Sequence, residues 1–235
     1  MLKLMKLELK RNRIKGYILA AQLITFAILG LTYMFAFMPQ IDESQSEMEL
    51  FMNYSGLTNL LCVMSLLCFT VLAAVMFNRF VVEEYTGKKA ILLFSYPVDR
   101  SRILWAKVLT VFLFTVAAMT ASGLVTFSIF FITEAIFHIV QDTLTLNIGL
   151  NAFVFIVSYS LIAASFAVIS LWFGYWKKSP SATIVANVIL ISLFANLLVL
   201  GIPNAFAAIG AAAGCVCIGY LFIQNIRGKI MKLEV

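Results

Sequence analysis

The length and composition of the chain exclude a water-soluble globular fold. Its 235 residues are 63% apolar and 12% charged, whereas soluble domains average about 45–50% apolar and about 25% charged residues. A chain of this size cannot enclose so much apolar surface, so lipid must form part of its surroundings. The net charge of +6 does not predict a nucleic-acid partner, because the basic residues follow a membrane topology instead.

The amino-terminal segment, residues 1–15, has the pattern of a helix that lies on a membrane surface. Lys3, Lys6, Lys10 and Arg13 recur at spacings of three and four residues, which places them on one helical face. We predict an interfacial helix held by apolar contacts and anionic lipid. The alternative is a basic leader that only directs topology. A cleaved signal is disfavoured, because the apolar run that follows is too long.

Six apolar runs follow this segment, and each is long enough to cross a bilayer as a helix and lacks charge at its centre. The runs are Tyr17–Met38, Gly56–Val82, Ile103–Thr133, Ile148–Tyr175, Ala182–Gly201 and Ala205–Gln224. We therefore predict an all-α polytopic protein with six transmembrane helices in a single transmembrane domain, residues 1–235. Arg79 and Lys107 fall at the ends of runs, where we expect their side chains to extend toward the interface.

The basic residues predict which ends of these helices face the cytoplasm. All 17 lie before the first run, between or at the ends of the second and third, after the fourth, or after the sixth. The intervening loops carry no Lys or Arg, and their acidic residues are Asp42, Glu43, Glu47, Glu49, Glu134 and Asp142. By the positive-inside rule, both termini are predicted to be cytoplasmic.

The link between the second and third runs, residues 83–102, is the segment with the most information about function. Charges of both signs open it, and the apolar stretch 91–94 follows. That stretch is too apolar for a free loop, so part of it must be buried against this protein, the membrane surface or a partner. Pro97 suits a turn or the first turn of a new helix. The pattern favours a docking element.

The link resembles the signature region of the permease subunits of type-2 ABC exporters. In that family an acidic pair follows the second span, and then come a glycine, a coupling helix, a Pro-Val-x-Arg turn and a lysine inside the third span. The matching positions here are Glu83, Glu84, Gly87, Pro97-Val98-Asp99-Arg100 and Lys107. The segment Ser179–Ala182 is similar to the family's short link before its fifth helix.

The resemblance implies a mechanism and a set of partners. Two permease subunits, as a homodimer or a heterodimer, would surround a central path in a bacterial cell membrane, and two separate ATPase subunits would bind ATP and Mg. A coupling helix within residues 86–94 would enter a cleft in the ATPase, and the acidic pair would contact basic groups of the ATPase or this chain's Lys88 and Lys89. The coupling residues implied in this way are Glu83, Glu84, Tyr85, Thr86, Gly87, Lys88, Lys89, Leu92, Tyr96, Pro97 and Arg100.

The sequence predicts no catalytic chemistry, cofactor or metal in the chain itself. It has no G-x-x-x-x-G-K-[ST] loop, since Gly87-Lys88-Lys89 lacks the upstream glycine and the hydroxyl residue. The alternative functions are an ATPase-independent secondary transporter or channel and a membrane enzyme. Charges at mid-membrane depth would favour an ion-coupled transporter, and clustered polar catalysts would favour an enzyme. Neither pattern is present in the sequence.

Polar residues within the fifth run are the candidates for lining a transport path. Asn187, Ser192 and Asn196 lie in this run, and asparagine is costly in lipid unless it faces protein or a cavity. Hydrogen bonding between helices is the alternative role. The many aromatic residues suit a peptide, an antibiotic or another amphipathic cargo, and they suit lipid contact equally well.

Overall fold

The protein is helical throughout the part of the chain that the structure describes. This computed structural model describes residues 2–11, 14–41, 54–85, 100–137, 146–177, 179–201 and 205–232. Its elements are α1 (Leu2–Arg11), α2 (Lys15–Ile41), α4 (Tyr54–Phe77), the π-helix η2 (Asn78–Val82), α5 (Glu83–Tyr85), α7 (Arg100–Phe137), α8 (Leu146–Lys177), α9 (Pro180–Gly201) and α10 (Ala205–Lys232). The predicted all-α class is confirmed.

The predicted spans correspond to the long helices of the bundle. Five helices are long and apolar enough to cross a membrane: α2, α4 with η2, α7, α8 and α10. α9 adds a shorter apolar stretch, Pro180–Ala195. The prediction of a polytopic membrane protein is therefore confirmed, with α9 as the sixth and shortest apolar helix of the described residues.

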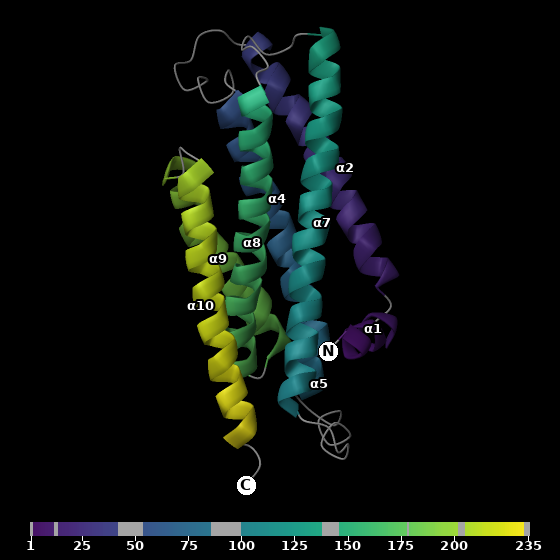
Figure 1. Ribbon diagram of the computed structural model, residues 1–235, viewed down its shortest axis with the longest axis vertical. Coiled ribbons are helices and arrows are strands. Elements are labelled where there is room, and N and C mark those ends of the chain that lie inside the picture. The colour runs from purple at the N-terminus through teal and green to yellow at the C-terminus, as the bar shows by residue number, and fades with distance from the viewer. Residues whose placement is uncertain are drawn as a thin grey trace.

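α8 is the central helix of the bundle. It packs against α4, α7, α9 and α10, and 78% of its most apolar window is buried, compared with 17% for α2 and 22% for α10. In Figure 1 it lies between α7 and α10. Ala163, Ala164 and Ala167 are fully buried on it, and small residues of this kind let helices approach closely in membranes. α2 and α10 consequently leave most of their apolar surface exposed on the outside of the bundle.

Gly174 allows the closest contact between α8 and α9. A Cβ atom at this position would lie 1.8 Å from the Thr183 hydroxyl oxygen and 3.3 Å from the Thr183 Cα atom. Only a glycine lets the first turn of α9 pack so tightly on the last turns of α8, which fixes where α9 enters the bundle.

The two ends of the bundle differ in charge. α1 and the last turns of α10 lie at the same end, the lower one in Figure 1. The ends of α8 and η2 and the start of α7 also lie there. We call it the basic end, because its described basic residues are Arg11, Lys15, Arg79, Arg102, Lys107, Lys177 and Arg227. This arrangement is the one that the positive-inside pattern requires, and the cytoplasmic position of the basic end remains a prediction.

Candidate functional site

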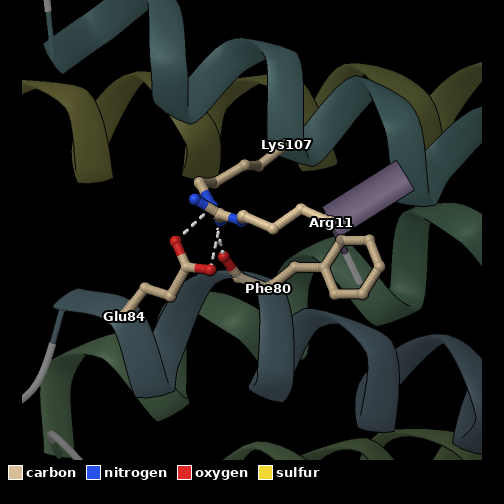
Figure 2. Close-up of polar contacts among 4 residues, drawn as sticks. All are labelled: Arg11, Phe80, Glu84 and Lys107. Carbon is tan, nitrogen blue, oxygen red and sulfur yellow. Dashed lines mark hydrogen bonds and ion pairs between the residues drawn. The ribbon is translucent and has the colours of Figure 1, made fainter. Parts of the chain in front are cut away.

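A cluster of charged side chains joins three separate segments at the basic end. Glu84 lies in α5, two residues after the end of η2, and its Oε1 atom accepts a hydrogen bond from Arg11 of α1. Its Oε2 atom accepts one from Lys107 of α7. The Lys107 ammonium also donates to the carbonyl oxygen of Phe80 in η2, over 3.0 Å. Figure 2 shows both basic groups converging on the one carboxylate. We call these four residues the Glu84 junction.

The contacts of the Glu84 junction differ greatly in burial, and therefore in energy. The side chains of Lys107, Glu84 and Arg11 are 0%, 13% and 50% exposed, respectively. Removing one partner of a buried ion pair costs about 3–5 kcal/mol, because the other charge stays desolvated. An exposed pair contributes about 0–1 kcal/mol. The contact between Glu84 and Lys107 thus carries most of the energy of the junction.

The burial of Lys107 corrects the sequence-based expectation for this residue. A lysine near the end of a span is expected to extend its side chain to the interface, yet the Lys107 side chain is fully buried inside the bundle. The physical reason is that a carboxylate and a main-chain carbonyl meet its ammonium group inside the bundle. An ammonium group with such partners does not need to reach water.

The π-helix η2 positions the acceptors for Lys107. The main-chain N–H of Glu83 reaches back five residues to the carbonyl oxygen of Asn78, a register that shifts every later side chain relative to an α-helix. π-Helical turns are rare and occur frequently at functional sites. Phe80, Val81 and Val82 are fully buried, and the Phe80 ring meets Tyr17 of α2 edge-on, with centroids 6.0 Å apart. The turn is therefore held firmly while Glu84 emerges beside it.

The remaining predicted coupling residues lie around the junction or outside the described chain. Glu83 is exposed, Tyr85 ends α5 and Arg100 begins α7. Thr86, Gly87, Lys88, Lys89, Leu92, Tyr96 and Pro97 fall within 86–99, outside the described residues. The sequence suggested Lys88, Lys89 or an ATPase as the partner of Glu84, and it did not suggest Arg11. No local spacing connects residues that are 73 and 23 positions apart, although the family pattern does single out Lys107.

Of the three candidates for path lining, the structure describes the side chains of Asn187 and Ser192, and these two do not share one face of α9. Asn187 is fully buried, and its amide oxygen and nitrogen have no hydrogen-bond partner among the described residues. Ser192 is exposed and donates to the carbonyl oxygen of Val188 over 2.8 Å. The side chain of Asn196 lies outside the described part. The buried Thr183 lies one turn before Asn187, and its hydroxyl also has no described partner. Thr183 therefore shares a face of α9 with Asn187, which Ser192 does not.

Glu134, at the end of the bundle opposite the junction, is a second correction. The sequence places it among the acidic residues of an outer loop, but the structure places it within α7, buried. The Tyr54 hydroxyl donates to its Oε1 atom over 2.9 Å, and Tyr33 and Thr133 share a hydrogen bond of the same length nearby. Across the described residues, no group of acidic, histidine and cysteine side chains is suited to hold a metal.

The described residues thus form a bundle of long apolar helices with a buried ion pair at its basic end. The chain belongs to the ABC-2 family transporter proteins, whose family model matches residues 4–202. It is also similar to the uncharacterized protein YcbO of Bacillus subtilis (strain 168), with 25% identity over 232 residues, 94% of this chain and 96% of that protein. No solved structure matches it.

Membership of this family defines the class of the protein. The chain is a membrane permease subunit of an ABC transporter, a multi-pass protein of a bacterial cell membrane. Such a subunit works with an ABC ATPase subunit and is itself a transport component.

Proposed function

We propose that the chain is the permease of an ATP-driven exporter and that the Glu84 junction transmits movement from the ATPase to the spans. Two ATPase subunits would bind ATP and Mg and dock on residues 83–102. A second permease, either another copy or a homologue, would complete the central path. The observation that carries this proposal is that Glu84, at the start of the link, contacts α1 and α7, and that Lys107 of α7 joins the same cluster to η2.

The junction has the physical properties that a transmission point needs. Glu84 lies two residues before the undescribed part of the link, so a displaced link displaces its carboxylate. Lys107 must follow that carboxylate, because separating the buried pair costs about 3–5 kcal/mol. α7 therefore moves with the link, and the Phe80 carbonyl and Arg11 extend the movement to η2 and α1. The weaker, exposed contact with Arg11 can break and re-form within a cycle.

The proposed cargo is a peptide, an antibiotic or another amphipathic compound that leaves the cell along α9. Asn187 supports this path, because its buried amide has no described partner and buried polar groups are almost always hydrogen-bonded. A hydrated path or a cargo polar group would supply the missing partners. Thr183 belongs to the same proposal, because it lies one turn before Asn187 and its buried hydroxyl also has no described partner. Ser192, on another face of α9, and Asn196 remain candidates for contact with the cargo farther along the helix.

Affinity purification of the protein from its native membrane, with identification of what accompanies it, tests the proposal. We expect a stoichiometric ATPase, whose ATP hydrolysis in reconstituted membranes depends on the permease. Glu84→Gln should weaken that dependence. Lys15→Gln is the matched control, because it changes an exposed residue at the same end, outside the junction. A stable protein that is recovered alone and moves solute without ATP would instead establish the ATPase-independent transporter.

A further inference from the structure

An apolar groove runs along the bundle between α7 and α10, with α8 as its floor. Trp105, Leu109 and Phe112 of α7 form one wall, Gly219 and Tyr220 of α10 form part of the other, and Ser165 lies at the base. The cavity has a volume of about 140 Å³. A protein cavity of about 150 Å³ holds a benzene molecule, so this groove accommodates a segment of hydrocarbon chain.

Gly219 is what opens the groove. A Cβ atom there would approach Ser165 no closer than 3.8 Å, so helix packing does not require a glycine at this position. The missing side chain instead leaves space in the wall of the groove. A larger residue at position 219 should therefore fill the groove without separating α10 from α8.

Aromatic groups close the groove toward the basic end. The rings of Trp105 and Tyr220 lie with centroids 5.9 Å apart, and Gln224 donates to the Tyr220 hydroxyl over 2.7 Å. Tryptophan and tyrosine side chains of this kind gather where the hydrocarbon region meets the headgroups of a bilayer. The groove therefore extends from the headgroup level at the basic end into the hydrocarbon region.

Positive charge lies just beyond this aromatic pair. Arg227 is one helical turn past the groove residue Ile223, and Arg102 is one turn before Trp105, so both share the faces that line the groove. The Nε atom of Arg227 is buried and has no hydrogen-bond partner among the described residues. A guanidinium group in this position is suited to a phosphate oxygen, which it binds through fixed donors.

From these four observations we infer that the groove is a binding site for an anionic phospholipid of the leaflet at the basic end. One acyl chain lies along Leu109, Phe112 and Gly219, the glycerol region lies beside Trp105 and Tyr220, and the phosphate accepts hydrogen bonds from Arg227. Basic pockets between transmembrane helices bind acidic lipid headgroups in this way. The groove lies between α7 and α10, and none of the residues that line it belongs to the Glu84 junction. The inference therefore holds or fails independently of the proposed function.

The test measures the fluorescence of Trp105 in nanodiscs that contain brominated lipid, which quenches by contact. Trp172→Phe and Trp176→Phe leave Trp105 as the only tryptophan of the three. We expect brominated phosphatidylglycerol in a phosphatidylcholine background to quench Trp105 more than brominated phosphatidylcholine at the same mole fraction. Arg227→Gln should weaken this preference roughly fivefold, since a basic group near anionic lipid contributes about that factor. Gly219→Leu should remove it.

Two controls separate this result from a general effect of charge or unfolding. Lys15→Gln removes one exposed positive charge at the same end, from a helix that does not line the groove, and should leave the preference unchanged. Each variant must also elute as the wild type does in size-exclusion chromatography. Equal quenching by the two lipids, or a preference that survives Arg227→Gln, would overturn the inference. Absence of quenching by either lipid would also overturn it, since another protein surface would then cover the groove.

Discussion

Lys107 and Glu134 are both buried ionisable side chains of α7, yet they differ in the charge of the groups that contact them. At the basic end, Lys107 donates to the carboxylate of Glu84 in α5 and to the carbonyl oxygen of Phe80 in η2. The same carboxylate also binds Arg11 of α1. At the opposite end Glu134 accepts a hydrogen bond from the neutral Tyr54 at the start of α4. α7 is thus attached at both of its ends to the continuous segment α4–η2–α5.

We propose that this difference separates an end that transmits movement from an end that stays fixed. The contact at the basic end is charged, adjoins the link and involves α1, so a force on the link reaches three segments. The contact at the opposite end joins α4 to α7 through a neutral hydroxyl group and lies far from the link. We expect α4 and α7 to pivot about the Tyr54–Glu134 contact when the link moves.

Glu84→Gln should have the largest effect on stability. It removes the negative charge beside a fully buried ammonium group, and the expected loss is about 3–5 kcal/mol. Thermal unfolding in detergent, followed by intrinsic fluorescence, measures the loss. The double variant Glu84→Gln/Lys107→Met should recover most of it, because no uncompensated charge remains. A double variant as unstable as the single one would show that the pair is not the source of the effect.

Gly174→Ala tests the bundle at a place that belongs to neither attachment. The added methyl group would overlap the Thr183 hydroxyl and approach its main chain, so α9 must shift. Overpacking of this kind costs about 1–3 kcal/mol. Thermal unfolding should report the loss, and Gly149→Ala provides the matched control, since a Cβ atom there meets nothing within 4 Å. Equal stability of the two variants would contradict the close contact between α8 and α9.

Tyr54→Phe weakens the fixed end and should cost about 1–3 kcal/mol, because a buried carboxyl group loses a hydrogen-bond donor. The dependence of ATP hydrolysis on the permease should remain in Tyr54→Phe, whereas Glu84→Gln should weaken it. Parallel measurement of unfolding temperature and ATP hydrolysis separates the two effects. Loss of coupling in Tyr54→Phe with the ATPase still bound would remove the distinction between the two ends.

Arg11→Gln should have the smallest effect on stability, about 0–1 kcal/mol, since half of the Arg11 side chain is exposed. High salt should reduce even this difference. Unfolding temperatures at low and high salt measure it. A loss as large as that of Glu84→Gln would show that Arg11, rather than Lys107, is the main partner of the carboxylate.

The sequence predicts the helices well because the bilayer imposes their length. Runs of about 20 apolar residues have few structures available in lipid, and the helices observed correspond to those runs. The family pattern also points to the acidic pair and to Lys107 as positions in the sequence, and their role in coupling stays a prediction. These features depend on local sequence or on a short motif, and a single amino-acid sequence is enough to recognise either.

The contacts that make the site could not be predicted in the same way. The register of η2 has no local signature, and the pairing of Arg11 with Glu84 depends on how α1 folds back on the bundle. The sequence predicts solvent-facing positions for Lys107 and Glu134, and both are buried for the same reason. Near the end of an apolar run, hydropathy does not show whether a charged side chain has a partner inside the bundle. Asn187 is predicted only in part. The free energy needed to place an amide in lipid predicts that it is buried, but it does not identify the group that the amide faces.

The central claim, that the Glu84 junction transmits movement from the ATPase, is tested most directly by distance measurements between spin labels. Labels on Leu113→Cys of α7 and Leu193→Cys of α9, both exposed residues and the second on a helix outside the junction, would be placed in a background without the four native cysteines. In the complex with its ATPase, Mg-ATP should shift the distance between them. Glu84→Gln/Lys107→Met should still bind the ATPase but lose the shift. A shift of the same size in the double variant would contradict the account.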